Sequence, residues 1–181
     1  MDLPAADDVI AFWREAGSEK WFAKDDGFDA SIRERFLELL GAAQRGELAA
    51  WEETPDGALA LAIVLDQFPR NLFRGTHLAY AADAQARGVT SRALARGFHH
   101  QCDRELAIFL YMPLVHSEDL VDQEQAVALF ETLALDENLR SAREHRDIVA
   151  RFGRFPHRNL VLGRRTTPAE QAFLDEGGFS G

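Results

Sequence analysis

Cysteine is nearly absent from this chain of 181 residues. Cys102 stands alone, which excludes an intrachain disulfide and a metal cage built from cysteines. Long apolar runs are missing as well, because the longest, 58–65 and 106–115, fall far short of the roughly 20 residues that a membrane-spanning helix needs. The first residues, MDLPAADD, are acidic and contain no apolar signal core. We therefore expect a cytoplasmic protein.

Basic residues are in deficit, with 20 Lys and Arg against 30 Asp and Glu, and only two of the twenty are lysines. The net charge of −10 disfavours binding to nucleic acid or to an anionic membrane surface. The arginines are nevertheless concentrated between residues 138 and 165, a segment that contains eight arginines and only two acidic residues. A cationic segment in an acidic protein indicates either internal acidic partners or an anionic ligand.

Sequence signatures of metal and cofactor chemistry are also lacking. No two of the six histidines are three or four residues apart, so the chain has no helical zinc motif. No glutamate stands three residues before a histidine, so the Glu-x-x-His pair of di-iron bundles is also absent. The chain has no phosphate-binding glycine loop and no Gly-x-Ser-x-Gly elbow. His145 falls on an apolar helical stripe and is expected in the core. We predict no metal and no cofactor.

Residues that favour strands are scarce, since Val, Ile and Thr together number 19, and no segment alternates apolar and polar residues. Apolar residues recur instead at helical spacing, and the prolines fall at expected helix boundaries or kinks. Thr54 before Pro55 is expected to cap one helix, and Thr167 with Glu170 forms a predicted capping box at the start of another. We predict a single all-α domain, residues 1–181, built as an α/α array of stacked antiparallel helix hairpins. The expected helices cover residues 9–15, 29–45, 55–65, 78–86 up to a stop at Gly88, 90–97, 103–111, 118–135, 138–152 and 168–175.

The first candidate site follows the most apolar of these helices. If helical spacing continues through Pro69, the polar residues between 66 and 74 form a stripe along one side of the chain that directly continues the apolar helix. Arginines in that position are partly buried and must be paired or bind an anion. Two interpretations stay open: an Asp66–Arg70 clamp that fixes a kink, or a ligand site. The stripe consists of Asp66, Gln67, Arg70, Asn71 and Arg74.

The second candidate site is the string His116-Ser117-Glu118-Asp119. Ser117 or Asp119 is expected to cap the helix that follows, and acids suit the positive end of its dipole. The alternative is that His116, oriented by Glu118 or Asp119, acts as a general acid or base.

The third candidate site lies within 151–164, where Arg154, His157, Arg158 and Asn159 surround a turn that contains glycine and proline. Guanidinium groups on such a turn suit carboxylate or phosphate recognition, and salt bridges to the acidic remainder of the chain are the alternative.

Two short strings in these sites resemble each other. Phe-Pro-Arg-Asn-Leu at 68–72 returns as Phe-Pro-His-Arg-Asn-Leu at 155–160, with one residue inserted. Chance or a shared turn geometry explains the likeness as well as a pair of equivalent elbows does.

At these motifs the chain resembles an uncharacterised bacterial family, domain of unknown function 924. The resemblance implies an all-helical fold similar to tetratricopeptide helix hairpins and supplies no established reaction. Val115 departs from the acidic residue expected before the histidine, which makes that acid dispensable to any chemistry here. The matching segments are Phe12-Trp13, Trp21-Phe22, 65–74, 116–119, 151–159 and Leu162-Gly163-Arg164.

Two functions compete, and the third possibility is that the polar residues form a purely architectural network. The first is a binding module whose polar groove takes an anionic small molecule or an acidic peptide through Asp66, Gln67, Arg70, Asn71, Arg74, Arg154, Arg158 and Asn159. The second is a hydrolase in which His116 or His157 is the general base, Glu118 or Asp119 orients it, and arginines stabilise negative charge. Both hypotheses expect Asp66, Arg70, His116, Glu118 and Arg158 to lie in one cluster.

Overall fold

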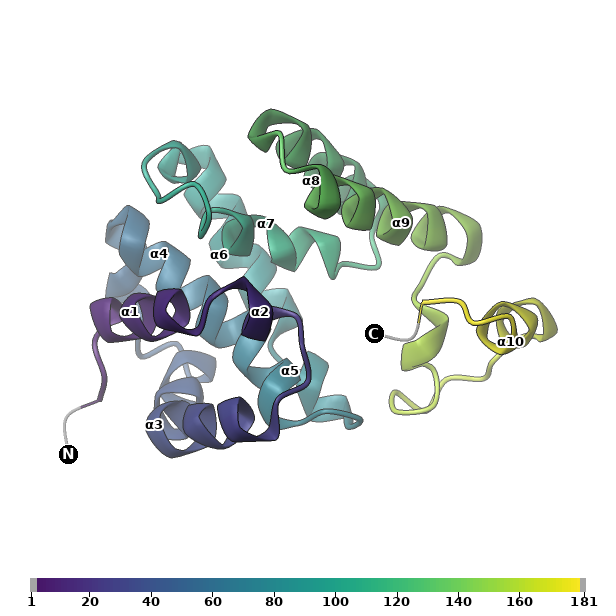
Figure 1. The fold of residues 1–181 in the computed structure, drawn as a ribbon, viewed down its shortest axis with the longest axis horizontal. Helices are drawn as coiled ribbons and strands as arrows, with labels where there is room; N and C mark the ends of the chain where they lie inside the picture. The colour runs from purple at the N-terminus through teal and green to yellow at the C-terminus, as the bar shows by residue number, and fades with distance from the viewer. Residues whose placement is uncertain (1–2, 180–181) are drawn as a thin grey trace. The chain divides into compact units, whose positions relative to one another are not determined.

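The computed structural model describes residues 3–179, and every regular element in that range is helical. This confirms the all-α prediction. The described residues divide into two compact units (Figure 1). Unit 1 contains the chain up to Arg74 and residues 78–113, and unit 2 contains residues 75–77 and the chain from Leu114 onward. The single-domain organisation stays a prediction. No helix among the described residues is long and apolar enough to cross a membrane.

Unit 1 is built from α-helices of 4 to 19 residues with short 3-10 or π-helical segments between them. In chain order it holds α1 (Ala6–Ala16), α2 (Ser18–Trp21), α3 (Asp26–Gln44), η1 (Ala49–Glu53), α4 (Pro55–Ala62), η2 (Ile63–Gln67), α5 (Phe68–Leu72), most of η3 (His77–Tyr80), α6 (Asp83–Ala95), η4 (Phe98–His100) and most of α7 (Ile108–Val115).

The central helix of unit 1 is the continuous run α4–η2–α5. Thr54 caps it by accepting a hydrogen bond from the Gly57 N–H, and Pro55 occupies its first turn, as the sequence predicts. Its apolar body is buried on all sides. η2 is a π-helical turn, in which the Phe68 N–H donates to the carbonyl of Ile63 five residues back. This wider turn lets the helix continue into Pro69, which has no N–H to donate.

An aromatic cluster fills the core of unit 1 around Trp13, whose side chain is fully buried. Its ring lies 5.6 Å from that of Phe28, 5.9 Å from that of Phe68 and 5.3 Å from that of Phe109. These contacts join α1, α3, α5 and α7, and tilted or edge-on arrangements of this kind add stability beyond the buried area alone.

Two expected helix boundaries differ clearly from the structure: the helix expected over 103–111 begins only at Ile108 and runs through Pro113 to Val115 as α7, and Gly88 is not a helix end. Gly88 does not end a helix but lies inside α6, which runs without interruption through the expected break. A side chain at this position would meet the Arg92 guanidinium at about 3.1 Å, and Arg92 in turn reaches Glu52 of η1. Gly88 does not adopt the positive φ of a helix-ending glycine, so a local reading of the sequence takes for a stop signal a glycine that lies inside a helix.

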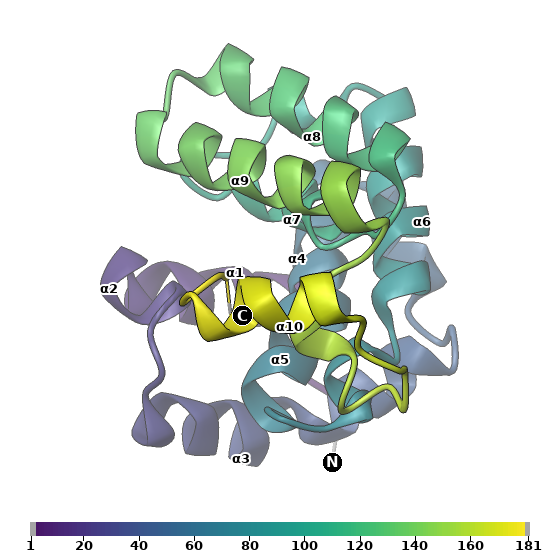
Figure 2. The same cartoon turned by 90° about the vertical axis from the view of Figure 1, so that its right-hand side faces the viewer.

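Unit 2 is organised around a helix hairpin and a short C-terminal helix. Its complete elements are α8 (Leu120–Leu133), α9 (Asp136–Phe152), η5 (Pro156–Arg158) and α10 (Pro168–Asp175). α8 and α9 run side by side in opposite directions (Figure 2). Asp119 caps α8 and Thr167 forms a capping box on α10, both as the sequence predicts. Ile148, Val149 and Phe155 form one buried cluster of this unit, with Phe152, Phe173 and Phe179 packed against it.

Replacing Gly57 by alanine should destabilise the protein. The new Cβ would collide with the carbonyl oxygen of Trp51 and stand 2.8 Å from the Thr54 hydroxyl that caps α4. We expect Gly57→Ala to lower the free energy of unfolding by about 1–3 kcal/mol, as overpacking does.

The matched control is Gly41→Ala in α3, where the Cβ meets only the flexible end of Arg45 at 3.2 Å. Helix propensity favours that change by up to about 1 kcal/mol. Urea denaturation of both variants measures the difference, and equal stabilities would contradict the close approach at Gly57.

Candidate functional site

The first predicted motif forms a compact ionic cluster in unit 1. Asp66 is only 1% exposed, and its carboxylate lies 3.1 Å from the Arg70 guanidinium. Arg70 also donates to both carboxylate oxygens of Asp83 in α6, at 2.9 and 3.1 Å, while Gln67 donates to Asp66 at 2.6 Å. Burial opposes the charge of Arg70, but the two acids outweigh that effect and raise the pKa of its guanidinium. The Asp66–Arg70 pair considered from the sequence is present.

The other two residues of this motif share a single acid. The Asn71 amide donates to Asp29 of α3 at 2.7 Å, and Arg74 donates to both oxygens of the same carboxylate, at 2.9 and 3.2 Å. The polar stripe, which begins in η2 and ends after α5, is therefore joined to α3 and α6 by hydrogen bonds to carboxylates.

The second motif meets the third in unit 2 through Glu118. Arg164 donates to both of its carboxylate oxygens, at 2.6 and 2.9 Å, and the Phe155 N–H donates to one of them at 2.8 Å. Burial alone would raise the pKa of Glu118, but Arg164, the Phe155 N–H and Arg158 together lower it. Glu118 thereby anchors the turn after α9 beside the start of α8.

A second buried carboxylate, Glu170 of α10, completes this network. It is 2% exposed and accepts hydrogen bonds from Arg154 at 2.6 and 2.9 Å and from the Thr167 N–H at 2.7 Å. The Arg154 hydrogen bonds, with those of Thr167, lower the pKa of Glu170 to about 2 despite its burial. Asn159 links the two ion pairs, because its amide donates to Glu170 at 3.3 Å and its oxygen accepts from Arg164 at 3.0 Å.

The two similar strings noted in the sequence share a bonding pattern. Each buries its phenylalanine, its proline and its asparagine. Asn71 donates to Asp29, which also binds Arg74, and Asn159 donates to Glu170, which also binds Arg154. The first string is α-helical and the second forms the 3-10 turn η5. Both therefore use an asparagine to orient a carboxylate that an arginine neutralises.

The histidines of unit 2 gather around aromatic rings. His145 is buried and its Nδ1 lies 2.7 Å from the Ser141 carbonyl oxygen, in agreement with the expected core position. The His157 ring lies 5.7 Å from Phe155 and 5.2 Å from Phe179, and its Nδ1 is buried without a hydrogen bond in the described part of the chain. Burial, reinforced by Arg158, lowers the pKa of His157 to about 3.

The carboxylates of the predicted acid–base pairs are engaged elsewhere. Glu118 binds Arg164 and the Phe155 N–H, and Asp119 accepts from the Val121 N–H at the start of α8. Among residues 3–179, no group of three or more His, Cys, Asp or Glu side chains is placed to hold a metal ion. The catalytic roles of His116, Glu118, Asp119 and His157 stay predictions.

The residues expected to converge are divided between the two units. Asp66 and Arg70 belong to unit 1, whereas His116, Glu118 and Arg158 belong to unit 2. Their convergence in one cluster stays a prediction. The sequence analysis missed the acids Asp29, Asp83 and Glu170, of which Glu170 alone carried a signal, as the third helical residue of a capping box.

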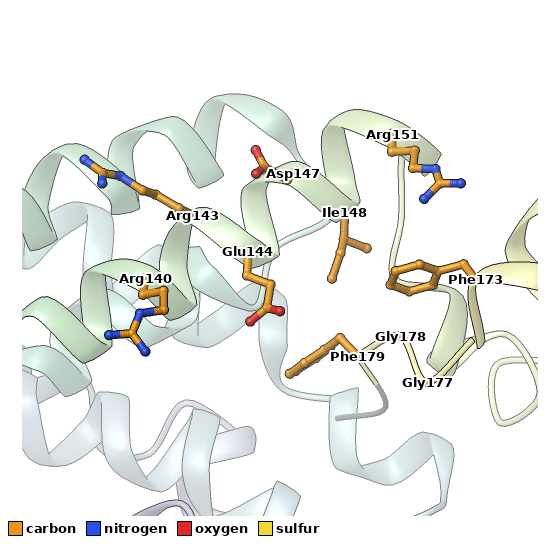
Figure 3. Close-up of a pocket in the computed structure, with 10 residues that line it drawn as sticks. All are labelled: Arg140, Arg143, Glu144, Asp147, Ile148, Arg151, Phe173, Gly177, Gly178 and Phe179. Atoms are coloured by element: carbon orange, nitrogen blue, oxygen red, sulfur yellow. The ribbon is translucent and has the colours of Figure 1, made fainter. Parts of the chain in front are cut away.

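A pocket of about 490 Å³ opens in unit 2 between α9 and the segment that contains α10 and the residues after it (Figure 3). Ile148 and Glu144 point from α9 toward the rings of Phe173 and Phe179, while Arg143 and Asp147 point away (Figure 3). Arg143 pairs with Glu131 at 2.9 Å and Asp147 with Arg146 at 2.6 Å.

Two further arginines border this pocket and form no ion pair within residues 3–179. Arg140 stands at one end, and Arg151 stands near Phe173 (Figure 3). Both belong to the cationic segment that the sequence revealed, but their spacing gave no reason to single them out.

Arg70→Ala should cost much more stability than a matched change at an exposed ion pair. It leaves Asp66 and Asp83 without the guanidinium that compensates their burial, and breaking a buried pair costs about 3–5 kcal/mol. Arg92→Ala is the control, because Arg92 binds both oxygens of Glu52 but its side chain is 57% exposed, against 18% for Arg70.

For Arg92→Ala we expect a loss of at most about 1 kcal/mol, the usual contribution of an exposed pair. Urea denaturation compares the two variants. Equal losses would show that Arg70 is not a structural clamp.

His157 should make the protein less stable in mild acid. The unfolded chain takes up a proton near the ordinary imidazole pKa of 6.5, whereas folded His157 resists it down to about 3. Stability is therefore lost as pH falls below about 6.5, with a slope of at most about 1.4 kcal/mol per pH unit.

His157→Gln cannot be protonated and should flatten this slope between pH 6.5 and 4, measured by denaturation at a series of pH values. His77→Gln, at an exposed position, serves as the control. A wild-type slope that survives in His157→Gln would refute the assignment.

Comparison with known proteins places the chain in a family. A model described as a bacterial protein of unknown function, DUF924, matches residues 9–178. A search of curated proteins finds no match. The solved structure of a protein of unknown function, ATU0120 from Agrobacterium tumefaciens, is 47% identical, with 95% of this chain and 97% of that chain covered and a TM-score of 0.92. The resemblance seen in the sequence is thus confirmed, and the chain belongs to the DUF924 family of bacterial proteins of unknown function.

Proposed function

We propose that the protein is a binding module for an anionic ligand, either a small molecule or an acidic peptide, and that the pocket beside α9 receives it. One observation carries the proposal: Arg140 and Arg151 border a pocket of about 490 Å³ and form no ion pair within the described residues. That volume is typical of ligand pockets. Arginine is the side chain best suited to hold carboxylate or phosphate groups.

The arginines singled out from the sequence favour a different role. Arg70, Arg74 and Arg154 each bind both oxygens of a carboxylate in their own unit. A ligand at these positions would have to replace a protein carboxylate that is already well placed. Ligand binding by these arginines, and by Asp66, Gln67, Asn71, Arg158 and Asn159, stays a prediction.

Two finer predictions also belong here. The tetratricopeptide-like stacking of hairpins is supported by the antiparallel pairing of α8 and α9, which are joined by a two-residue connection. The cytoplasmic location stays a prediction.

A panel of anions should reveal the ligand through the melting temperature. Phosphate, sulfate, citrate, octanoate and acidic peptides are compared at constant ionic strength, so that general screening is not mistaken for binding. An anion at 100 times its dissociation constant adds about 2.7 kcal/mol to the folded state. We expect at least one anion to raise the melting temperature of the wild type.

The shift should be lost in Arg151→Gln and kept in Arg165→Gln. Arg165 is an exposed arginine of the same unit that does not line the pocket, so the control has the same charge change. If no anion exceeds the chloride reference, or if both variants respond alike, the α9 pocket is not an anion site.

A further inference from the structure

We infer that the α9 pocket takes a monocarboxylate with an apolar body, an inference that rests on the proposed function. Three features of the pocket carry it: an arginine held by aromatic rings, an apolar floor, and a carboxylate that limits how much negative charge can enter.

Arg151 is held in place without using its hydrogen-bonding capacity. Its guanidinium carbon lies 4.6 Å from the centre of the Phe152 ring and 5.8 Å from that of Phe173. Cation–π contacts of this kind restrain the side chain, and no hydrogen bond of its guanidinium occurs in the described structure. The planar fork is therefore free for a carboxylate, and its restraint lowers the entropy lost on binding.

The floor of the pocket is apolar. Ile148 is buried in the core of unit 2, while Phe173 and Phe179 are partly buried and packed against that core. All three side chains face the pocket (Figure 3). A ligand that contacted only the arginine would leave these apolar side chains exposed to water, whereas a ligand with an alkyl or aryl body would cover them.

Glu144 sets the charge that the pocket accepts. It points toward the pocket (Figure 3) and forms no ion pair within the described residues. Arg143 and Asp147 also line the pocket, but each is already paired with another side chain, so two arginines and one carboxylate of the lining form no ion pair within the described residues. A single negative charge balances this set. A phosphate dianion or a nucleotide brings excess negative charge close to Glu144 and is disfavoured.

Isothermal titration calorimetry with a series of straight-chain carboxylates tests the apolar body. Hexanoate, octanoate and decanoate are titrated below their micelle concentrations. Each added CH2 group that the pocket buries should tighten the dissociation constant about three- to fourfold.

The head group is tested at constant chain length. Decanamide should bind about tenfold or more weakly than decanoate, because a neutral amide cannot form the charge-assisted, bidentate pair that a carboxylate forms with a guanidinium. Decyl phosphate should also bind more weakly than decanoate in the wild type. In Glu144→Gln its affinity should approach that of decanoate, because the repelling carboxylate is gone.

The protein variants connect both series to this pocket. Arg151→Gln should weaken decanoate about tenfold or more, and Arg165→Gln should leave it unchanged. Circular dichroism melting shows that each variant is folded before it is titrated.

The outcomes separate the two proposals. If phosphate or citrate binds and the affinity of the straight-chain carboxylates does not depend on their chain length, the monocarboxylate inference is overturned and the proposal of an anion pocket stands. Equal affinity of decanoate and decanamide would also overturn the inference, because the carboxylate would contribute nothing. The absence of binding by every anion would overturn both.

Discussion

The burial of carboxylates against arginines is the constraint on which both units depend. Asp66 and Glu170 are almost fully removed from water, and each lies against a guanidinium and accepts a hydrogen bond from a further donor. The pairs join successive segments of the chain: α5 to α6 in unit 1, across 13 residues, and the turn after α9 to α10 in unit 2, across 16 residues. Contacts between apolar helix faces alone would leave these buried polar groups without hydrogen-bond partners, which is costly. The segments that connect the helices are therefore placed so that each buried carboxylate meets an arginine.

The sequence predicted those features of the fold that depend on residues close together in the chain. Thr167 as a cap correctly marked the start of α10, and the apolar run after Pro55 identified the enclosed helix. The acids that neutralise the arginines were not predicted, because Asp29 lies 45 residues from Arg74 and nothing local encodes that distance. Gly88 misled because glycine ends many helices by adopting a positive φ, whereas Gly88 does not adopt one and α6 continues through it.

The arginines of the cationic segment divide into two classes. Arg154 and Arg164 are each paired with a carboxylate of their own unit, in a bidentate geometry that a lysine could not reproduce. Arg140 and Arg151, in the same stretch of sequence, border an open pocket. Charge counting treats these residues alike, and only the partners found in the fold distinguish structural arginines from those available to a ligand.

The bond between Glu118 and Arg164 spans 46 residues of chain, which bears on how the protein is made. During synthesis Glu118 leaves the ribosome well before the arginine that compensates its charge, and Arg154 precedes Glu170 by 16 residues. The ionic network of unit 2 therefore cannot close until almost the whole chain is available, since such contacts require long loops to be ordered first. A nascent chain stalled before Arg164 would expose an unfinished unit 2 to chaperones and proteases, whereas the acid and base partners of unit 1 would already be complete.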